Sequence, residues 1–466
     1  MKRNRLQLTL LFLVLCHLIC SGQAVPKVSF ISLDSAQDVV RGMSSSLPTE
    51  LGPIETIDAA KWADWVEHQD REVRNRLDRG TEDTLTNLLR FGVTFTKEYR
   101  IDDAYLVHYG DSSLVNAFAD KRADDLIRAL AAPNPPEGIA GMRAFLEKKG
   151  FFLKTPAERA EVKQYLLTNL ARMRDDFLKY RAETKDDRRF EMFQDRGISL
   201  DSNLWPDYQI DATFREMAGK GLLKHASVRR IAIVGPGLDF ANKEAGNDFY
   251  PPQTIQPFAV LDSLFRLGLA DPASAELYTL DISPEVNLHI ERWRKKAASG
   301  QPYVVQLPWN TERPMSQYYR ERFTTYWQNL GSEIGDAVPS IPVPQAASAT
   351  KTRAVRIRPG IVRRITPLDA NVVYQQLDIE PNQKFDLVIG TNIFLYYGAL
   401  EQTLARKNIA AMLKPGAYLL SNDKLPDTVP SGLEKVWVTT TEMSHEPQII
   451  DYIFCYRRAR GAGQNK

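Results

Sequence analysis

Residues Arg229 to Leu238 read RRIAIVGPGL, an apolar run that passes directly into a Gly-Pro-Gly turn. Such a run is typical of a strand buried on both faces of a parallel sheet. Gly235 and Gly237 let the backbone turn tightly and approach a ligand, because neither carries a Cβ atom. Two later segments end comparable strands: YTLDIS carries Asp281, and KFDLVIGTNIFLYY carries Asn392. Together they predict a ligand pocket at the carboxyl edge of the sheet, where open α/β folds bind ligands.

Strand and helix patterns alternate from Val228 onward, which predicts a parallel sheet with helices on its faces. The expected strands are 230–235, 276–282, 371–378, 384–391, 417–422, 434–441 and 448–457, and the expected helices are 254–268, 284–298 and 399–413. No helical pattern separates the last two strands. We therefore expect them to pair as an antiparallel hairpin at the edge of the sheet.

An insertion at 300–370 interrupts this alternation with a strand, a helix, a Pro/Ala/Ser-rich loop and a basic segment, KTRAVRIRPGIVRRI. Its basic residues are Lys351, Arg353, Arg356, Arg358, Arg363 and Arg364. They fit either a solvated strand or a surface for an anionic substrate or partner, since arginine suits carboxylate and phosphate.

The chain before Val228 has a different pattern. Residues 56–225 carry apolar residues at three- and four-residue intervals, which predicts an all-helical domain. Residues 25–55 are mixed and rich in Ser, Pro and Gly, so we expect a loosely ordered linker. His68 and His108 are isolated, and no metal site is expected.

The first 24 residues have the pattern of a secretory signal peptide: Lys2, Arg3 and Arg5 precede the apolar run LTLLFLVLCHLIC, which ends in SGQA. This predicts a periplasmic or secreted protein. The run is shorter than the roughly 20 residues of a spanning helix, so no stable membrane span is expected. A lipid-modified cysteine is disfavoured, because Cys16 and Cys20 each follow a large apolar residue. A start site further downstream would instead leave a cytoplasmic protein.

Length and composition limit the number of domains, the class of partner and the number of disulfides. The 466 residues predict about two or three domains. Lysine plus arginine number 60 against 58 acidic residues, so charge indicates no nucleic-acid partner. Without the leader, Cys455 is the last remaining cysteine, and no intramolecular disulfide is expected. Its alternating surroundings favour a packed strand residue over a reactive thiol.

The polar residues at the strand ends each suit part of a nucleoside ligand. Asp281 can accept two hydrogen bonds from a ribose diol, or it can cap the helix that follows. Asp378, at the end of the expected third strand, can accept a hydrogen bond from an adenine amino group. Asn392 can both donate and accept hydrogen bonds. Tyr396 and Tyr397 follow it, either to orient a substrate or to pack in the core.

The order of these segments resembles the class I S-adenosylmethionine-dependent methyltransferases over about residues 228–457. The segments that carry the resemblance are IAIVGPG, YTLDIS, YQQLDIEPNQKFDLVIGTNIFLYY and AAMLKPGAYLLSND, with the terminal hairpin after them. FDLVIGTNIFLYYGALEQTLARKNIAAMLKPGAYLL is particularly similar to the branch that includes chemotaxis-receptor methyltransferases. The resemblance implies a Rossmann-like domain at 226–460, with a seven-stranded sheet and an antiparallel last strand, behind the all-helical domain.

The same resemblance implies S-adenosyl-L-methionine as the cofactor and a set of residues that bind it. These are Gly235, Pro236, Gly237, Asp239, Asp281, Ile282, Asp378 and Thr391, with Asn392 and Tyr396 at the methyl-transfer end. Ile233 departs from the pattern, because many members carry an acid there. Asp239 stands where many have a third glycine, and it is a candidate to replace that acid.

These inferences predict a methyltransferase acting on an unidentified small-molecule or protein acceptor. The alternative is an exported protein of the same fold that has lost catalysis and serves as a binding or scaffold protein. The leader favours this alternative, because S-adenosylmethionine is a cytoplasmic metabolite. The sequence does not indicate an oligomeric state.

Overall fold

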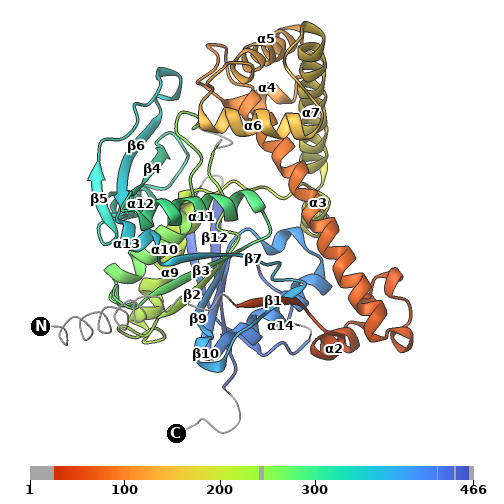
Figure 1. Cartoon of the computed structure of the whole chain (residues 1–466), viewed down its shortest axis with the longest axis vertical. Helices are drawn as coiled ribbons and strands as arrows, with labels where there is room; N and C mark the ends of the chain where they lie inside the picture. The colour runs from red at the N-terminus through yellow and green to blue at the C-terminus, as the bar shows by residue number, and fades with distance from the viewer. Residues whose placement is uncertain (1–25, 241–245, 428, 446–447, 461–466) are drawn as a thin grey trace, which may run out of the picture.

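The structure is a computed structural model that describes residues 26–240, 246–427, 429–445 and 448–460 (Figure 1). The expected signal peptide at 1–24 lies outside the described residues. Within these ranges, no helix combines the length and the apolar character needed to cross a bilayer.

Seven strands form the central sheet, in the order β11-β12-β10-β9-β2-β3-β7. Their bounds are β2 (Arg230–Val234), β3 (Glu276–Asp281), β7 (Ile365–Asp369), β9 (Phe385–Gly390), β10 (Leu413–Ser421), β11 (Leu433–His445) and β12 (Gln448–Arg458). Five neighbouring strands, β10, β9, β2, β3 and β7, run parallel to one another. The strand β12 is antiparallel to both β10 and β11. The predicted seven-stranded sheet with an antiparallel terminal hairpin is confirmed. Cys455 of β12 is buried in the core, which raises the pKa of its thiol to about 12.

The expected third strand at 371–378 is wrong. The strand in that place of the sheet is β7, six residues earlier in the chain. A turn at Asn371 follows it, in which the carbonyl of Asn371 accepts hydrogen bonds from the backbone N–H groups of Tyr374 and Gln375. The apolar residues of this turn are buried, which explains why they resemble a strand in the sequence. The segment β8 (Gln375–Asp378) pairs with β1 (Lys27–Phe30) in a separate two-stranded sheet.

Residues 26–55 contain the strand β1 and the helix α2 (Leu33–Gly42) and are not the loose linker that we expected. After β1, the helix α2 begins at Ser32, whose side chain accepts a hydrogen bond from the backbone N–H of Ser35. Val39 and Val40 of α2 are buried in the core that covers one face of the sheet. The N-terminal segment is therefore part of the sheet domain.

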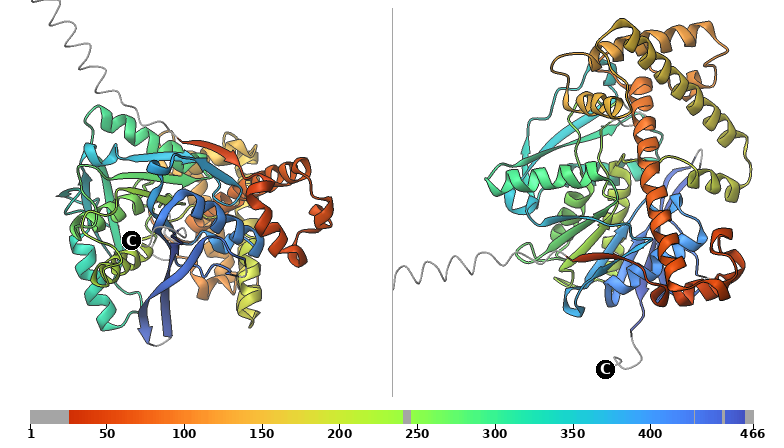
Figure 2. Two further views of the ribbon diagram at one scale, coloured as in Figure 1. Left: turned by 90° about the horizontal axis from the view of Figure 1, so that it is seen from below. Right: turned by 45° about the vertical axis from the view of Figure 1, so that its right-hand side comes forward.

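The helical half comprises α3 (Ala59–Phe91), α4 (Asp103–Leu106), α5 (Ser113–Leu130), α6 (Glu137–Lys148), α7 (Pro156–Ala182), α8 (Asp186–Gln194) and α9 (Leu204–Gly219). It differs from the expected domain at 56–225, because its two ends pack on the sheet. Trp62 and Trp65 of α3 lie in the core on one face, and Phe214 of α9 lies in the core on the other. A separate helical core joins the C-terminal half of α3 to α5, α6 and α7. Figures 1 and 2 show α3 running from the level of α2 to these helices.

The remaining helices of the sheet domain are α10 (Gln256–Arg266), α11 (Pro284–Ala298) and α14 (Ala399–Met412). The insertion forms β4 (Tyr303–Asn310), α12 (Gln317–Asn329), β5 (Gly335–Val338), β6 (Thr350–Ile357) and α13 (Pro359–Val362). Its three strands make an antiparallel sheet in the order β4-β6-β5. Arg353 donates to the carbonyls of Trp327 and Leu330, and Arg364 donates to those of Ala275 and Ala273. These two arginines hold the insertion in place. Lys351, Arg356, Arg358 and Arg363 are exposed, and the anionic-surface interpretation stays a prediction.

The loop after the glycine turn connects the sheet to the helical core. Phe240 is buried in that core, beside Gly138 of α6. Further along, Asp248 accepts hydrogen bonds from the backbone N–H groups of Val93 (2.8 Å) and Thr94 (3.1 Å), just beyond α3. The helical core therefore holds both sides of this loop.

We expect Phe240→Ala to lower the free energy of unfolding by about 3 to 5 kcal/mol, because it leaves a cavity in the helical core. Chemical denaturation followed by circular dichroism measures this change. Phe152→Ala is the matched control, since Phe152 is 45% exposed. Equal losses in the two variants would contradict the packing of Phe240 in the core.

Candidate functional site

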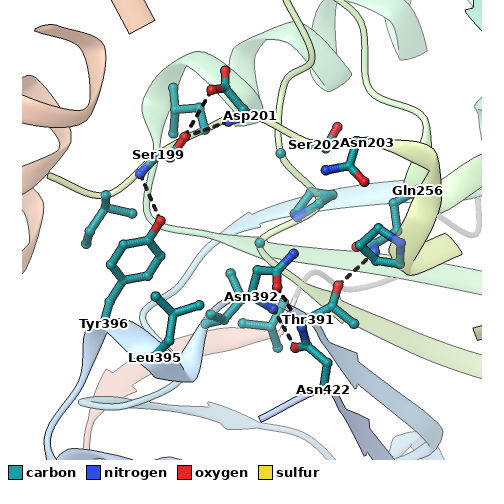
Figure 3. A pocket seen from close by; sticks show the side chains of 18 of the residues that line it. Ser199, Asp201, Ser202, Asn203, Gln256, Thr391, Asn392, Leu395, Tyr396 and Asn422 are labelled. Carbon is teal, nitrogen blue, oxygen red and sulfur yellow. Dashed lines mark hydrogen bonds between the residues drawn. The ribbon is translucent and has the colours of Figure 1, made fainter. Parts of the chain in front are cut away.

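A cavity of about 490 Å³ lies at the carboxyl ends of β2, β3, β7 and β9 (Figure 3). Its volume is within the roughly 300–1,000 Å³ of small-molecule sites. The sheet contributes the glycine turn, the ends of β3 and β7, and the residues after β9. Eight of the predicted site residues line it: Gly235, Pro236, Gly237, Asp281, Ile282, Thr391, Asn392 and Tyr396. Asp239 and Asp378 do not.

The glycine turn has the backbone conformation that the sequence predicts. Gly235 and Gly237 have φ values of 62° and 73°, a region that favours glycine. A Cβ atom on Gly235 would clash with the side chain of Ile393, and one on Gly237 would lie 2.8 Å from the carbonyl oxygen of Leu200. Both positions therefore favour glycine by their positive φ, and Gly237 also by the approach of the Leu200 backbone, while the turn still faces the cavity.

The turn does not form a phosphate-binding site of the dinucleotide type. In such sites a helix begins directly after the glycines and points its N–H groups at the phosphates. Here α10 begins only at Gln256, after the loop that contacts the helical core. The charged residues in the described lining are Asp201, Asp281, Asp451 and Arg313. This acidic lining favours a neutral or cationic ligand over a pyrophosphate.

Asp281 ends β3 and lies at the cavity wall. Its carboxylate accepts a hydrogen bond from the backbone N–H of Ser283 (2.8 Å). The pKa of Asp281 is raised to about 7, chiefly by burial and in part by the nearby Asp369, while hydrogen bonds from Ser283 and Gly237 act in the opposite direction. The cap of α11 is Ser283, so the alternative role of Asp281 as that helix cap is wrong.

Asp378 was predicted to follow the third strand into the cavity, but there Asn371, two residues after the end of β7, lines it instead. Asp378 is exposed and pairs with Lys27 of β1, outside the cavity, because β8 is not part of the central sheet. Asn371 and Val372 line the cavity after β7. The Asn371 amide nitrogen donates to Asp70 (2.8 Å), and its oxygen accepts from the backbone N–H of Val373 (3.1 Å). After β7, the cavity is thus lined by an amide and a valine, and not by a carboxylate.

Asp239 does not line this cavity, so the structure does not support its predicted place in the site. Its carboxylate accepts hydrogen bonds from the hydroxyl of Tyr250 (2.8 Å) and the amide of Gln253 (3.3 Å). Burial raises the pKa of Asp239 to about 7. It lines a second cavity of about 30 Å³, the volume of one water molecule. Asp239 therefore does not replace the acid that is missing at Ile233.

Thr391 and Asn392, after β9, form the polar floor of the cavity. The hydroxyl of Thr391 accepts a hydrogen bond from the amide of Gln256 (3.0 Å). Asn392 has a φ of 59°, uncommon for a residue with a side chain. Its backbone N–H donates to the side-chain oxygen of Asn422 (2.8 Å), whose amide donates back to the side-chain oxygen of Asn392 (2.6 Å). Figure 3 shows the amide nitrogen of Asn392 pointing away from Asn422 into the cavity.

Tyr396 lines the cavity but directs its hydroxyl to a neighbouring segment. This hydroxyl accepts a hydrogen bond from the backbone N–H of Ser199 (3.4 Å) (Figure 3). Tyr397 is buried and also lines the cavity. The geometry gives Tyr396 a structural contact and does not test its predicted catalytic role.

The segment at 193–206, which joins α8 to α9 and which we call the strap, was missed by the sequence analysis. It forms one wall of the cavity with Phe193, Ile198, Ser199, Leu200, Asp201, Ser202, Asn203, Trp205 and Pro206. Its sequence has no strand or helix periodicity. The available signal was Asn203, which caps α9 by accepting a hydrogen bond from the backbone N–H of Trp205 (3.1 Å). Arg313, Met443 and Asp451 also line the cavity, and the guanidinium of Arg313 lies over the ring of Trp205, 4.9 Å from its centroid.

No protein-family model matches the chain, and no curated protein matches it in sequence. Among solved structures, the chain is similar to the N-methyltransferase NodS from Bradyrhizobium japonicum in complex with S-adenosyl-L-homocysteine, with 10% identity, a TM-score of 0.26 and coverage of 58% of this chain and 97% of that chain. A putative sarcosine dimethylglycine methyltransferase from Galdieria sulphuraria shares 11% identity, with a TM-score of 0.27 and coverage of 59% and 96%. The magnesium protoporphyrin IX methyltransferase of Synechocystis PCC 6803, with bound SAM, shares 10% identity, with a TM-score of 0.24 and coverage of 61% and 90%. Similarities this distant identify neither the acceptor nor the branch of the superfamily.

We expect the stability of the protein to fall as the pH rises from about 4 to 7, in part because of Asp281. Its folded pKa of about 7 exceeds the unfolded value of roughly 3.9, so the folded state binds the proton more tightly. This contribution is fully present below the unfolded pKa and is lost as the pH rises through the folded pKa. Asp281→Asn should reduce the decline between pH 5 and 7 by about 2 kcal/mol. Urea denaturation at several pH values measures it, and parallel profiles for the two proteins would contradict the shifted pKa.

Proposed function

We propose that the protein is an S-adenosylmethionine-dependent methyltransferase whose acceptor is a small molecule or a protein group. The observation that carries this proposal is the meeting of the glycine turn, Asp281 and Asn392 around one cavity at the carboxyl edge of the sheet. These residues come from β2, β3 and β9, which are neighbours in the sheet although far apart in sequence. The resemblance of the sequence segments to the class I methyltransferases agrees with this arrangement.

The chemistry of the lining fits the cofactor in three respects. The carboxylate of Asp281 can accept hydrogen bonds from a ribose diol. Ile282 and Val372 present apolar side chains on which a flat base can pack. The acidic side chains of Asp201, Asp281 and Asp451 line the cavity, and a cation bound beside them would favour their ionised forms. The fit is weaker at Ile233, where the acid found in many members is missing.

When bound, the sulfonium cofactor supplies the methyl group, and the chain aligns the acceptor with it. Asn392 is held by Asn422 in a strained backbone conformation, which directs its amide into the cavity. Such fixed positioning is the main contribution that a protein makes to a displacement of this kind. We therefore assign Asn392 to the methyl-transfer end, with Thr391 beside it.

The cofactor assignment predicts that the chain beginning at Val25 binds S-adenosylmethionine and S-adenosylhomocysteine. Asp281→Ala should weaken binding of both at least tenfold, because hydrogen bonds to a charged group contribute about 1.5 to 3 kcal/mol. Isothermal titration calorimetry measures both affinities. Asp378→Ala is the matched control, and it should bind like the parent because this carboxylate lies outside the cavity.

The alternative, an exported scaffold protein that has lost catalysis, makes the opposite prediction. In that case neither ligand would give a heat of binding in the parent protein. Equal weakening by Asp281→Ala and Asp378→Ala would also contradict the site, because only the first residue lines the cavity.

We also propose that residues 1–24 direct export of the protein. A fusion of residues 1–30 to a reporter enzyme that is active only outside the cytoplasm should therefore be active. A second fusion, in which charged residues replace the apolar run between Leu8 and Ile19, should be inactive. Retention of the first fusion in the cytoplasm would refute export and would remove the conflict with a cytoplasmic cofactor.

A further inference from the structure

The helix α3 approaches the strap so closely that both need glycine at the crossing point. A Cβ atom on Gly80, in the middle of α3, would clash with the backbone carbonyl of Ile198. A Cβ atom on Gly197 would clash with the backbone nitrogen of Gly80. Glycine inside a helix costs about 1 kcal/mol relative to alanine. The contact with the strap, which a Cβ atom at this position would prevent, offsets this cost and explains why residue 80 is glycine.

Arg76, one turn before Gly80 on α3, joins three segments. Its guanidinium donates hydrogen bonds to the backbone carbonyls of Phe193 (3.2 Å) and Arg196 (2.9 Å) at the start of the strap. It also donates to the carbonyl of Tyr396 (3.1 Å), in the loop after β9. The backbone carbonyl of Arg76 accepts a hydrogen bond from the N–H of Ile198 (3.1 Å). One residue of the helical half thus fixes both the strap and a loop of the catalytic edge.

The strap in turn lies directly over the glycine turn. The carbonyl of Leu200 accepts a hydrogen bond from the backbone N–H of Leu238 (2.7 Å), the residue after Gly237. The N–H of Ser199 donates to the hydroxyl of Tyr396. Since the strap forms one wall of the cavity, its position sets the space that is left for a ligand.

We propose that Arg76 is a positioning residue that holds the strap closed over the ligand cavity, and that this is one role of the helical half. A ligand would be enclosed between the strap and the sheet edge, so that its entry and release require the Arg76 contacts to open. The identity of the ligand rests on the function proposed above. The closure itself is a property of the free protein and does not depend on that identity.

Hydrogen exchange of the full chain, followed by mass spectrometry of peptides within 193–206, tests the closure without any ligand. Gly80→Ala should favour the helix by its propensity and yet increase exchange in the strap at least tenfold, about 1.4 kcal/mol, because the new methyl group displaces Ile198. Gly141→Ala in α6 is the matched control, since a Cβ atom there meets open space. It should leave exchange in the strap unchanged.

Arg76→Ala should increase exchange in the same peptides through loss of the carbonyl contacts. Arg76→Lys keeps the charge and part of the contacts, so it should restore part of the protection. Arg143→Ala is the control, because Arg143 also donates to backbone carbonyls, those of Leu130 and Ala132, but in the helical core. Unchanged exchange in the strap of both Gly80→Ala and Arg76→Ala would overturn the proposal.

Binding of S-adenosylhomocysteine supplies a second measurement. It should protect the strap in the parent, and its affinity should fall at least tenfold in Gly80→Ala and remain unchanged in Gly141→Ala. An opened strap with unchanged affinity would overturn the positioning role. A parent that does not bind this ligand would instead refute the proposed function, while the exchange of the free protein would still decide whether Arg76 closes the strap.

Discussion

The structure depends on the crossing of two backbones above the sheet edge, where the N–H of Leu238 donates to the carbonyl of Leu200. Both groups would otherwise be left without partners as the chain leaves β2, and buried backbone groups without partners are costly. The crossing is possible because Gly237 has no Cβ atom and a φ of 73°. The same glycine therefore allows the strap to approach and leaves the cavity beneath it open. The helical half is attached to both sides of the crossing, through Arg76 and through Phe240.

Burial of carboxyl groups is the second constraint on the site. It raises the pKa of Asp207, Asp239 and Asp281 to about 7 and that of Asp423 to about 6. Of these residues, only Asp281 lines the cavity. A cation bound beside it would favour its ionised form, and an anion would oppose it. Burial of Asp281, which destabilises the free protein at neutral pH, therefore also favours a cationic ligand over an anionic one.

The parts of the site that could be predicted are those encoded within single strands. The run into Gly235, and Asp281 and Asn392 at the ends of later strands, depend on local patterns that parallel strands bring to one edge. Asp378 was misplaced because Asn371 forms a turn within an apolar run that resembles a strand. The strap could not be predicted, since its place depends on contacts with α3 that are more than a hundred residues away in sequence.

Ile233 stands where the resemblance leads us to expect an acid, so the acid of the cavity comes from other segments. Ile233 is buried in the apolar core of the sheet, and Asp239 binds Tyr250 behind the turn, so β2 and the residue after Leu238 give the cavity no carboxylate. Asp201 of the strap does line the cavity, where its carboxylate accepts a hydrogen bond from Ser199 (3.2 Å). An acid on the strap is present in the site only while the strap is closed. Part of the negative charge that a strand would fix permanently therefore depends here on the contact between the strap and α3.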